Sequence, residues 1–142
     1  MSTSFVHVGI TVSDIDKAGG FYIKYFGFKK KYEFLFNEKF FQENLSLFRQ
    51  PEGVFADMQM IESPDGVVLE LFRFSNAESG GAEWQRTGWN HIALRVDDLP
   101  GLYAQMKMDG VEFFMAPKIR SDGSGHWVYL KDPDGNMLEL WD

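Results

Sequence analysis

The sequence contains no cysteine among its 142 residues, only three histidines and five prolines, and no long hydrophobic run. The absence of cysteine excludes disulfide bonds, thiolate metal ligands and cysteine nucleophiles, and it is typical of a reducing compartment. The first residues, MSTSFVHVG, lack the basic segment and apolar core of a secretion signal, and no apolar stretch approaches the ~20 residues of a membrane span. We therefore expect a cytoplasmic protein that does not associate with membranes.

Positive charge is also scarce, because 14 Lys and Arg residues face 21 Asp and Glu residues and leave a net charge of -7. Nucleic acids and anionic membrane surfaces would repel such a chain, so neither is an expected partner. The length suits a single domain, residues 1–142, with one sizeable core. A small molecule is the expected partner.

One design of strand and helix occurs twice in the chain. Residues 5–12 alternate in hydropathy, which predicts a strand with one apolar face, and Ser13 or Asp14 begins a helix that Gly27 ends. The apolar face comprises Val6, Val8, Ile10 and Val12, and the other face comprises Phe5, His7, Gly9 and Thr11.

The second copy begins at His91. Ile92, Leu94 and Val96 form its apolar face, opposite His91, Ala93 and Arg95, and a helix follows that begins at Asp97 or Asp98, has Pro100 in its first turn and ends near Gly110.

A further pair of segments, residues 63–74 and 132–142, also repeats. Each has the turn-forming sequence Pro-Asp-Gly followed by a strand with a glutamate between leucines, Glu70 in the first and Glu139 in the second. Each half of the chain therefore supplies one histidine and one glutamate.

Other segments have no counterpart in this repeat. Residues 32–55 are rich in phenylalanine and have no clear period, so we expect a loop that serves as a flap or a dimer contact. Residues 75–88 are the expected linker between the halves, and residues 118–125 the expected connection of a solvated hairpin. Aromatic residues make up 16% of the chain, which suits an apolar substrate pocket or a dimer interface.

The two histidines and two glutamates gain meaning as a set. A single histidine or glutamate on a strand is usually structural, but a half-buried carboxylate such as Glu70, among apolar neighbours, needs a cation or a proton. If the halves pack about a pseudo-twofold axis, the four side chains converge, and two imidazoles with two carboxylates suit a divalent metal ion.

These motifs resemble those of the vicinal oxygen chelate superfamily, which includes glyoxalase I, methylmalonyl-CoA epimerase, extradiol dioxygenases and the fosfomycin and bleomycin resistance proteins. The resemblance spans nearly the whole chain. The matching segments are HVGITVSDIDKAGGFY, DGVVLELFRF, NHIALRVDDL and DPDGNMLELWD.

The resemblance implies an α+β fold of two βαβββ modules, at about residues 4–76 and 86–142, whose curved mixed sheets enclose a central metal-binding cleft. It also implies a homodimer, and one divalent ion per site, which could be Ni, Zn, Co, Mn or Fe. The implied ligands are His7, Glu70, His91 and Glu139. This set most resembles that of glyoxalase I, because dioxygenases and fosfomycin resistance enzymes typically have two histidines and one glutamate.

The resemblance to glyoxalase I implies a lyase or isomerase that removes a proton next to a carbonyl through a metal-bound enediolate. Glu139 is the implied catalytic base, with Glu70 as its counterpart. The alternatives are an epimerase of the methylmalonyl-CoA type, a non-heme iron dioxygenase of the extradiol type, and a resistance or small-molecule-binding protein without turnover.

Three further residues are candidates for substrate binding. Thr11 occupies the position where the glyoxalase I family often has an arginine that holds the glutathione carboxylate, so glutathione use is in doubt. Arg95, four residues after His91, could bind an anionic group or pair with a nearby carboxylate. His126 could act as an acid or base near the substrate, or it packs or caps the strand.

Overall fold

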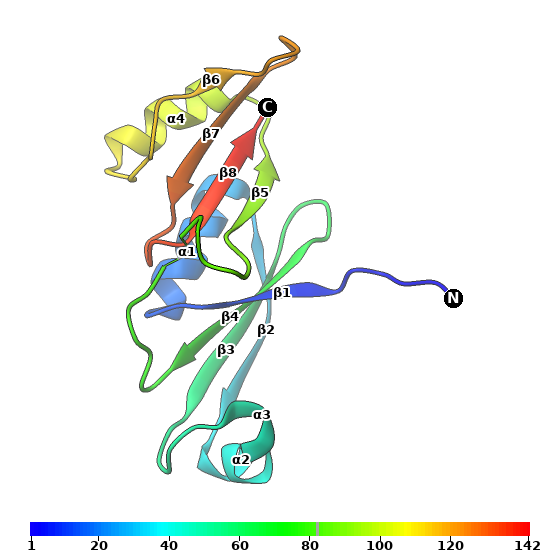
Figure 1. Cartoon of the computed structure of the whole chain (residues 1–142), viewed down its shortest axis with the longest axis vertical. Helices are drawn as coiled ribbons and strands as arrows, with labels where there is room; N and C mark the ends of the chain where they lie inside the picture. Colours follow the sequence, from blue (N-terminus) through cyan, green and yellow to red (C-terminus); the bar gives the residue numbers. More distant parts are fainter. Residues whose placement is uncertain (82) are drawn as a thin grey trace. The chain divides into compact units, whose positions relative to one another are not determined.

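The computed structural model describes residues 1–81 and 83–142 and divides the chain into two compact units, Met1–Ser79 and Gly80–Asp142. Each unit follows the order strand, helix and three further strands, which confirms the α+β prediction of two βαβββ modules (Figure 1). Among the described residues, the strands form two four-stranded mixed sheets, in the orders β1-β4-β3-β2 and β5-β8-β7-β6. The assignment of both modules to one domain stays a prediction.

The first unit contains two additional short helices between its second and third strands. Its elements are β1 (His7–Thr11), α1 (Ile15–Phe26), β2 (Lys29–Phe36), α2 (Glu38–Glu43), α3 (Leu45–Phe48), β3 (Ala56–Glu62) and β4 (Val68–Phe74).

The second unit has the same plan without those two helices. Its elements are β5 (His91–Arg95), α4 (Leu99–Met108), β6 (Lys118–Ile119), β7 (His126–Lys131) and β8 (Met137–Trp141). As predicted, residues 118–125 form the β6 strand and the turn into β7. No helix in the part of the chain that the structure describes is long and apolar enough to span a membrane.

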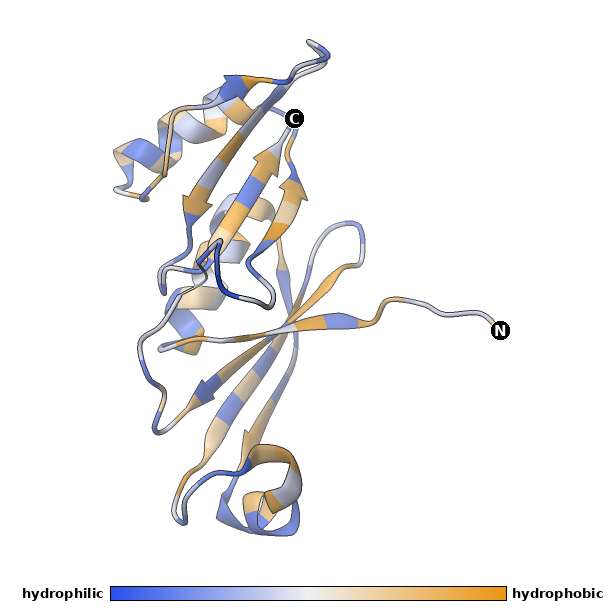
Figure 2. Cartoon of the chain, viewed as in Figure 1, coloured by the Kyte–Doolittle hydropathy of each residue, from blue (hydrophilic) through white to orange (hydrophobic). Residues whose placement is uncertain are grey.

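The first strand begins later than predicted. β1 pairs in parallel with β4 from His7, opposite Val68, to Thr11, opposite Phe72. Val6 precedes the first paired residue of β1, and the residues just before β4 form a turn rather than a strand. The Val6 side chain is 69% exposed. The prediction that the strand starts at Phe5 and buries Val6 was therefore wrong, whereas the alternation along β1 is correct (Figure 2).

Helix boundaries follow the predicted signals. Asp14, rather than Ser13, caps α1 by accepting a hydrogen bond from the Lys17 amide at 2.9 Å, and Gly27 ends the helix with φ = 70°. Asp98, rather than Asp97, caps α4 by accepting from the Gly101 amide at 3.0 Å.

Residues 32–55 are not the long loop that was predicted. Their first part, Tyr32–Phe36, completes β2 against β3, and the rest contains α2 and α3. Asn37 starts α2 because its Oδ1 accepts a hydrogen bond from the Phe40 amide at 3.0 Å. The alternating tyrosine and phenylalanines of β2 carried a strand signal that the high phenylalanine content of the segment obscured.

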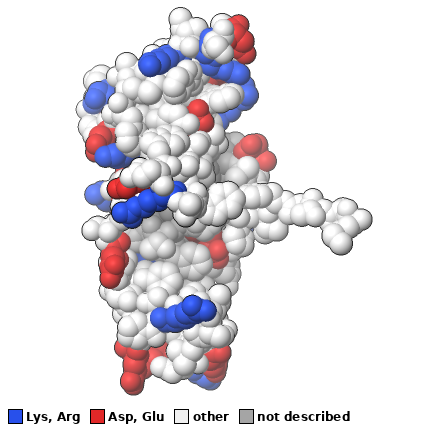
Figure 3. Space-filling view, in the orientation of Figure 1, with Lys and Arg blue, Asp and Glu red and all other residues white. Residues whose placement is uncertain are grey.

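The expected linker, residues 75–88, contains no helix or strand in its described part, and the boundary between the units falls within it. Ala82, in the same stretch, lies outside the described residues. Figure 3 shows acidic and basic side chains interspersed over the face in view, consistent with the acidic composition.

Helix α1 covers one face of the first sheet and leaves the other to the site. At the contact, Gly19 faces Leu71 and Gln59, whose side chain is only 1% exposed. A Cβ at Gly19 would lie 2.8 Å from Gln59 Oε1, so the buried side chain of Gln59 would have to shift to accommodate any residue larger than glycine.

We expect Gly19→Ala to destabilise the protein relative to Gly20→Ala. The two glycines are neighbours in α1, but a Cβ at Gly20 would meet no atom within 4 Å. Gly20→Ala should therefore gain about 0.5–1 kcal/mol from helix propensity, whereas overpacking against Gln59 should cost Gly19→Ala about 1–3 kcal/mol. Urea unfolding measures both, and equal stabilities would contradict the packing described here.

Candidate metal centre

The first unit brings His7 and Glu70 together. The two lie on the neighbouring strands β1 and β4, and Gly9, two residues after His7 on the same face, is the register partner of Glu70. His7 Nε2 lies 3.1 Å from Glu70 Oε2, and the Glu70 side chain is 15% exposed. A Cβ at Gly9 would lie 3.9 Å from Glu70 Oε2, an ordinary contact distance, so a small side chain would also be tolerated at this position.

The second unit repeats this arrangement with His91 and Glu139. The residues lie on the parallel strands β5 and β8, and Ala93 takes the place of Gly9 as the register partner of the glutamate. His91 Nε2 lies 3.4 Å from Glu139 Oε2, and the Glu139 side chain is 13% exposed. The two sheets therefore present the same histidine and glutamate pair at matching positions.

The contacts of His91 suit metal coordination. Its Nδ1 lies 2.5 Å from Asn90 Oδ1, which can only accept, so Nδ1 donates the hydrogen. In a neutral imidazole, Nε2 then carries a lone pair directed towards the Glu139 carboxylate. Two electron-rich atoms at this distance are stabilised by a proton or a cation between them. Imidazole nitrogen and carboxylate oxygen are both common ligands of divalent ions, so the residues fit such an ion.

The two pairs differ in the residue across the adjacent antiparallel strand. Tyr129 on β7 is the register partner of Glu139, whereas Met60 on β3 is the register partner of Glu70. Burial raises the pKa of the Tyr129 hydroxyl above its ordinary value, and the charge of Glu139 and a hydrogen bond to it raise the pKa further. The hydroxyl thus stays protonated and donates to Glu139, and it also lies 3.4 Å from His91 Nε2.

Removing this hydroxyl should weaken metal binding without unfolding the protein. In Tyr129→Phe the ring keeps its contacts with Trp84 and His91, at centroid distances of 5.2 and 5.1 Å, but Glu139 loses its donor. We expect metal affinity to fall about tenfold, as for other residues that orient ligands, with little change in Tm. Tyr103→Phe, in the same unit, is the control, and an equal effect in the two variants would contradict this role.

The structure places the three candidate substrate residues differently. Thr11 and Arg95 lie on the same strand faces as His7 and His91, by the alternation of β1 and β5. His126 precedes Trp127 and so points to the face opposite that of Tyr129 and Glu139. Its Nδ1 lies 3.2 Å from Asp142 Oδ2, and this placement favours the packing role over substrate contact.

Sequence reasoning did not identify Asn90 or Tyr129 as parts of the site. Asn90 could have been found, because an amide beside a candidate ligand is a natural partner for its second nitrogen. Tyr129 could not, because its position opposite Glu139 depends on the register of β7 against β8.

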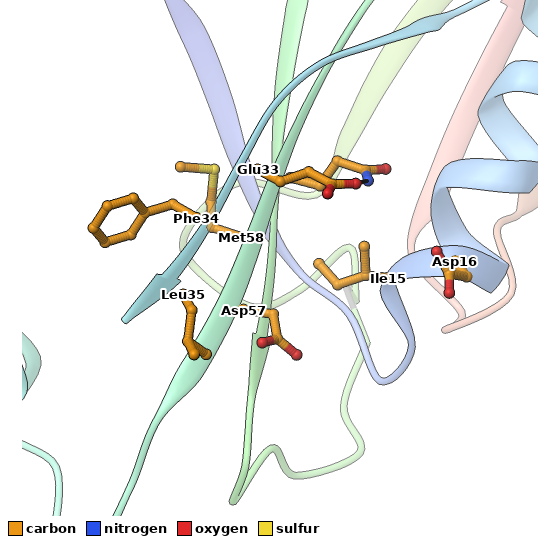
Figure 4. Close-up of a pocket in the computed structure, with 8 residues that line it drawn as sticks. Ile15, Asp16, Glu33, Phe34, Leu35, Asp57 and Met58 are labelled. Carbon is orange, nitrogen blue, oxygen red and sulfur yellow. Dashed lines mark hydrogen bonds between the residues drawn. The ribbon is translucent and has the colours of Figure 1, made fainter. Parts of the chain in front are cut away.

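A groove of about 370 Å³ opens elsewhere in the first unit, beside α1, β2 and β3 (Figure 4). It contains none of the predicted site residues. Its three carboxylates are already compensated. Glu33 accepts a hydrogen bond from Gln59 Nε2 at 2.5 Å, Asp57 pairs with Arg73, and Asp16 lies 3.8 Å from Lys30 Nζ. Within each unit, over the described residues, no three metal-ligating side chains gather at one point.

Comparisons with known proteins show which family the chain matches. A model of the Glyoxalase/Bleomycin resistance protein/Dioxygenase superfamily matches residues 4–140. A lactoylglutathione lyase of Schizosaccharomyces pombe is 27% identical over 94% of this chain, which spans only 45% of that protein. A probable lactoylglutathione lyase of Vibrio cholerae is also 27% identical, over 95% of this chain and 87% of its own length.

Solved structures share the fold at low sequence identity. A glyoxalase family protein from Bacillus cereus has a TM-score of 0.82 at 18% identity, covering 99% of this chain and 94% of its own. A fosfomycin resistance protein mutant from Listeria monocytogenes, solved with Mn(II) and 1S,2S-dihydroxypropylphosphonic acid, has a TM-score of 0.64 at 19% identity, covering 99% and 90%. The chain belongs to the Glyoxalase/Bleomycin resistance protein/Dioxygenase superfamily.

Proposed function

We propose that the protein is a metal-dependent lyase or isomerase of the glyoxalase I type, which removes a proton from the carbon next to a carbonyl. The observation that carries this proposal is the matched pair in each unit, with His Nε2 facing Glu Oε2 at 3.1 Å and 3.4 Å. One pair from each unit makes a set of two imidazoles and two carboxylates, whose charges balance a divalent ion.

A divalent ion bound by His7, Glu70, His91 and Glu139 would supply Lewis-acid stabilisation of the negative charge that develops on neighbouring substrate oxygens. The proton needs a base, and Glu139 is the carboxylate that we assign to this role. Tyr129 donates a hydrogen bond to that carboxylate and keeps it oriented, whereas the residue opposite Glu70 on the antiparallel strand β3 is Met60.

The similarity to lactoylglutathione lyases supports this reaction type, and we further propose a homodimer that acts on a small molecule. The two His-Glu pairs of one site belong either to one chain or to two subunits of the dimer. A dioxygenase of this family would use a further acid or base near the metal, such as His126, but His126 lies on the other face of its sheet and gives that alternative no support.

The first test is the metal content of protein purified without chelators or a histidine tag. We expect about one nickel, cobalt, zinc or manganese ion per chain, since one ion uses two pairs. The loaded protein should then exchange the α-proton of a hemithioacetal or a 2-acyl thioester with deuterium from the solvent, as followed by NMR. About one iron ion per chain would instead favour the dioxygenase alternative, and failure to bind any of these ions would overturn the proposal.

A further inference from the structure

The sheet face that carries His7 and Glu70 continues into an aromatic surface. Along β4 the next residue on this face is Phe72, whose partners are Thr11 on β1 and Met58 on β3. Met58 is in turn paired with Phe34 on β2. Figure 4 shows Phe34 and Met58 projecting to one side of β2 and β3, away from Ile15 and Asp16.

Phenylalanines from β2, β4, α2 and α3 contact one another on this surface. The Phe36 ring lies 4.6 Å from Phe40, 4.8 Å from Phe34 and 5.9 Å from Phe72, between centroids. These rings are not sealed in the core: Phe36, Phe40 and Phe72 are half-buried and Phe34 is 42% exposed. We call the set the phenylalanine wall, and it comprises Phe34, Phe36, Phe40, Phe48, Phe72 and Phe74.

The part of this face that carries the wall has no cationic strand residue. By alternation, no Lys or Arg of the described segments His7–Thr11, Tyr32–Phe36, Ala56–Met60 and Val68–Phe74 lies on it. Arg73, the basic residue of these segments, lies on the opposite face and pairs with Asp57. The same face of the second sheet is different, because it carries Arg95 on β5. Lysines do lie at the other end of β2, where Lys29 is the register partner of Glu62 and Lys31 Nζ donates to Glu62 Oε1 at 2.9 Å. The part of the face beyond Glu70, around Phe72 and Phe34, therefore offers rings and no basic strand residue.

We propose that the substrate of the metal centre carries an aromatic or similarly broad apolar group beside its neighbouring oxygens, and that the phenylalanine wall binds this group. The proposal rests on the proposed function, since it places the oxygens at the His7 and Glu70 end of the face. An anionic group would meet no strand cation among these rings, whereas an aromatic group could pack against Phe34, Phe36 and Phe72. Offset and edge-to-face contacts of this kind favour aromatic ligands.

The test compares two bidentate probes on protein of known metal content. Benzohydroxamate and acetohydroxamate both chelate through neighbouring oxygens, and they differ in a phenyl ring against a methyl group. Calorimetry on the zinc-loaded or nickel-loaded protein should show benzohydroxamate binding at least about tenfold more tightly, because the ring adds buried apolar area. Equal affinities would overturn the proposal.

Neighbouring residues of β2 supply a matched pair of variants. Phe34 and Leu35 point to opposite faces, and both are exposed, at 42% and 57%. Phe34→Ala should weaken benzohydroxamate about three- to tenfold and leave acetohydroxamate unchanged, whereas Leu35→Ala should change neither. Equal effects of the two variants on benzohydroxamate affinity would contradict the proposed role of the phenylalanine wall in binding the ring.

Other outcomes separate this proposal from the proposed function. Metal content and acetohydroxamate binding report on the metal centre alone, so their loss in the unmodified protein would overturn the proposed function and the wall with it. If both probes bind and benzohydroxamate is not preferred, only the proposal that the phenylalanine wall binds the substrate is overturned. If Phe34→Ala changes the oligomeric state in sedimentation and not the probe preference, the wall is an interface between copies of this chain.

Discussion

Replacing Glu139 by glutamine is expected to lower kcat by about 10²–10⁴-fold while leaving the metal bound. Glutamine keeps an oxygen ligand and the size of the side chain, but it cannot accept the substrate proton as a base. The hydrogen bond from Tyr129 can still reach the amide oxygen, so the geometry of the second pair should persist. Metal content by elemental analysis and turnover of the exchange reaction measure the two effects separately.

Glu70→Gln is the matched control, because Glu70 faces His7 as Glu139 faces His91. We expect a smaller loss of turnover in this variant, since Met60 supplies no hydrogen bond to Glu70 in place of the one that Tyr129 gives to Glu139. Full activity in Glu139→Gln would remove this residue from its role as base. Equal losses in the two variants would show that the carboxylates share the role.

Removing either paired histidine should abolish stable metal binding. His7→Ala and His91→Ala each delete one nitrogen ligand, and we expect affinity to fall about 100-fold or more, at least as much as when a residue that only orients a ligand is lost. His126→Ala is the control, because its ring contacts Asp142 on the other face of the sheet and should leave metal binding unchanged. Equilibrium dialysis against zinc compares the three variants.

The same variants locate the site within a dimer. If each site takes one pair from each of two chains, a mixed dimer of His7→Ala and His91→Ala regains one intact set of four ligands. If each site lies within one chain, the mixed dimer has no intact set. Retained metal in both single variants would contradict the assignment of these histidines as ligands.

Much of the fold could be predicted because its signals are local. Alternation along β1 and β5, the caps at Asp14 and Asp98 and the Pro-Asp-Gly turns act over a few residues, so the sequence shows them directly. The repeat added the long-range information that local signals lack. It identified one histidine and one glutamate in each half, and the structure brings each pair into contact.

Errors arose where a residue depends on a strand distant in the sequence. Val6 continues the apolar alternation, yet it is exposed because the register of β1 with β4 begins one residue later. Residues 32–36 became a strand because β3 pairs with them along their whole length. Local propensity does not report whether such a partner is present.

The sequence by itself determined the family's two-module plan, the ends of α1 and α4 to within a residue or two, and the identity of the two histidine and glutamate pairs. Only the tertiary structure decided that Tyr129 supports Glu139 while Met60 lies opposite Glu70, and that Phe34 and Phe36 of β2 share a face with His7. The physical reason is that a side chain's own strand fixes its alternation, whereas strand register fixes which residues lie across from it, and register depends on pairing between segments far apart in the chain.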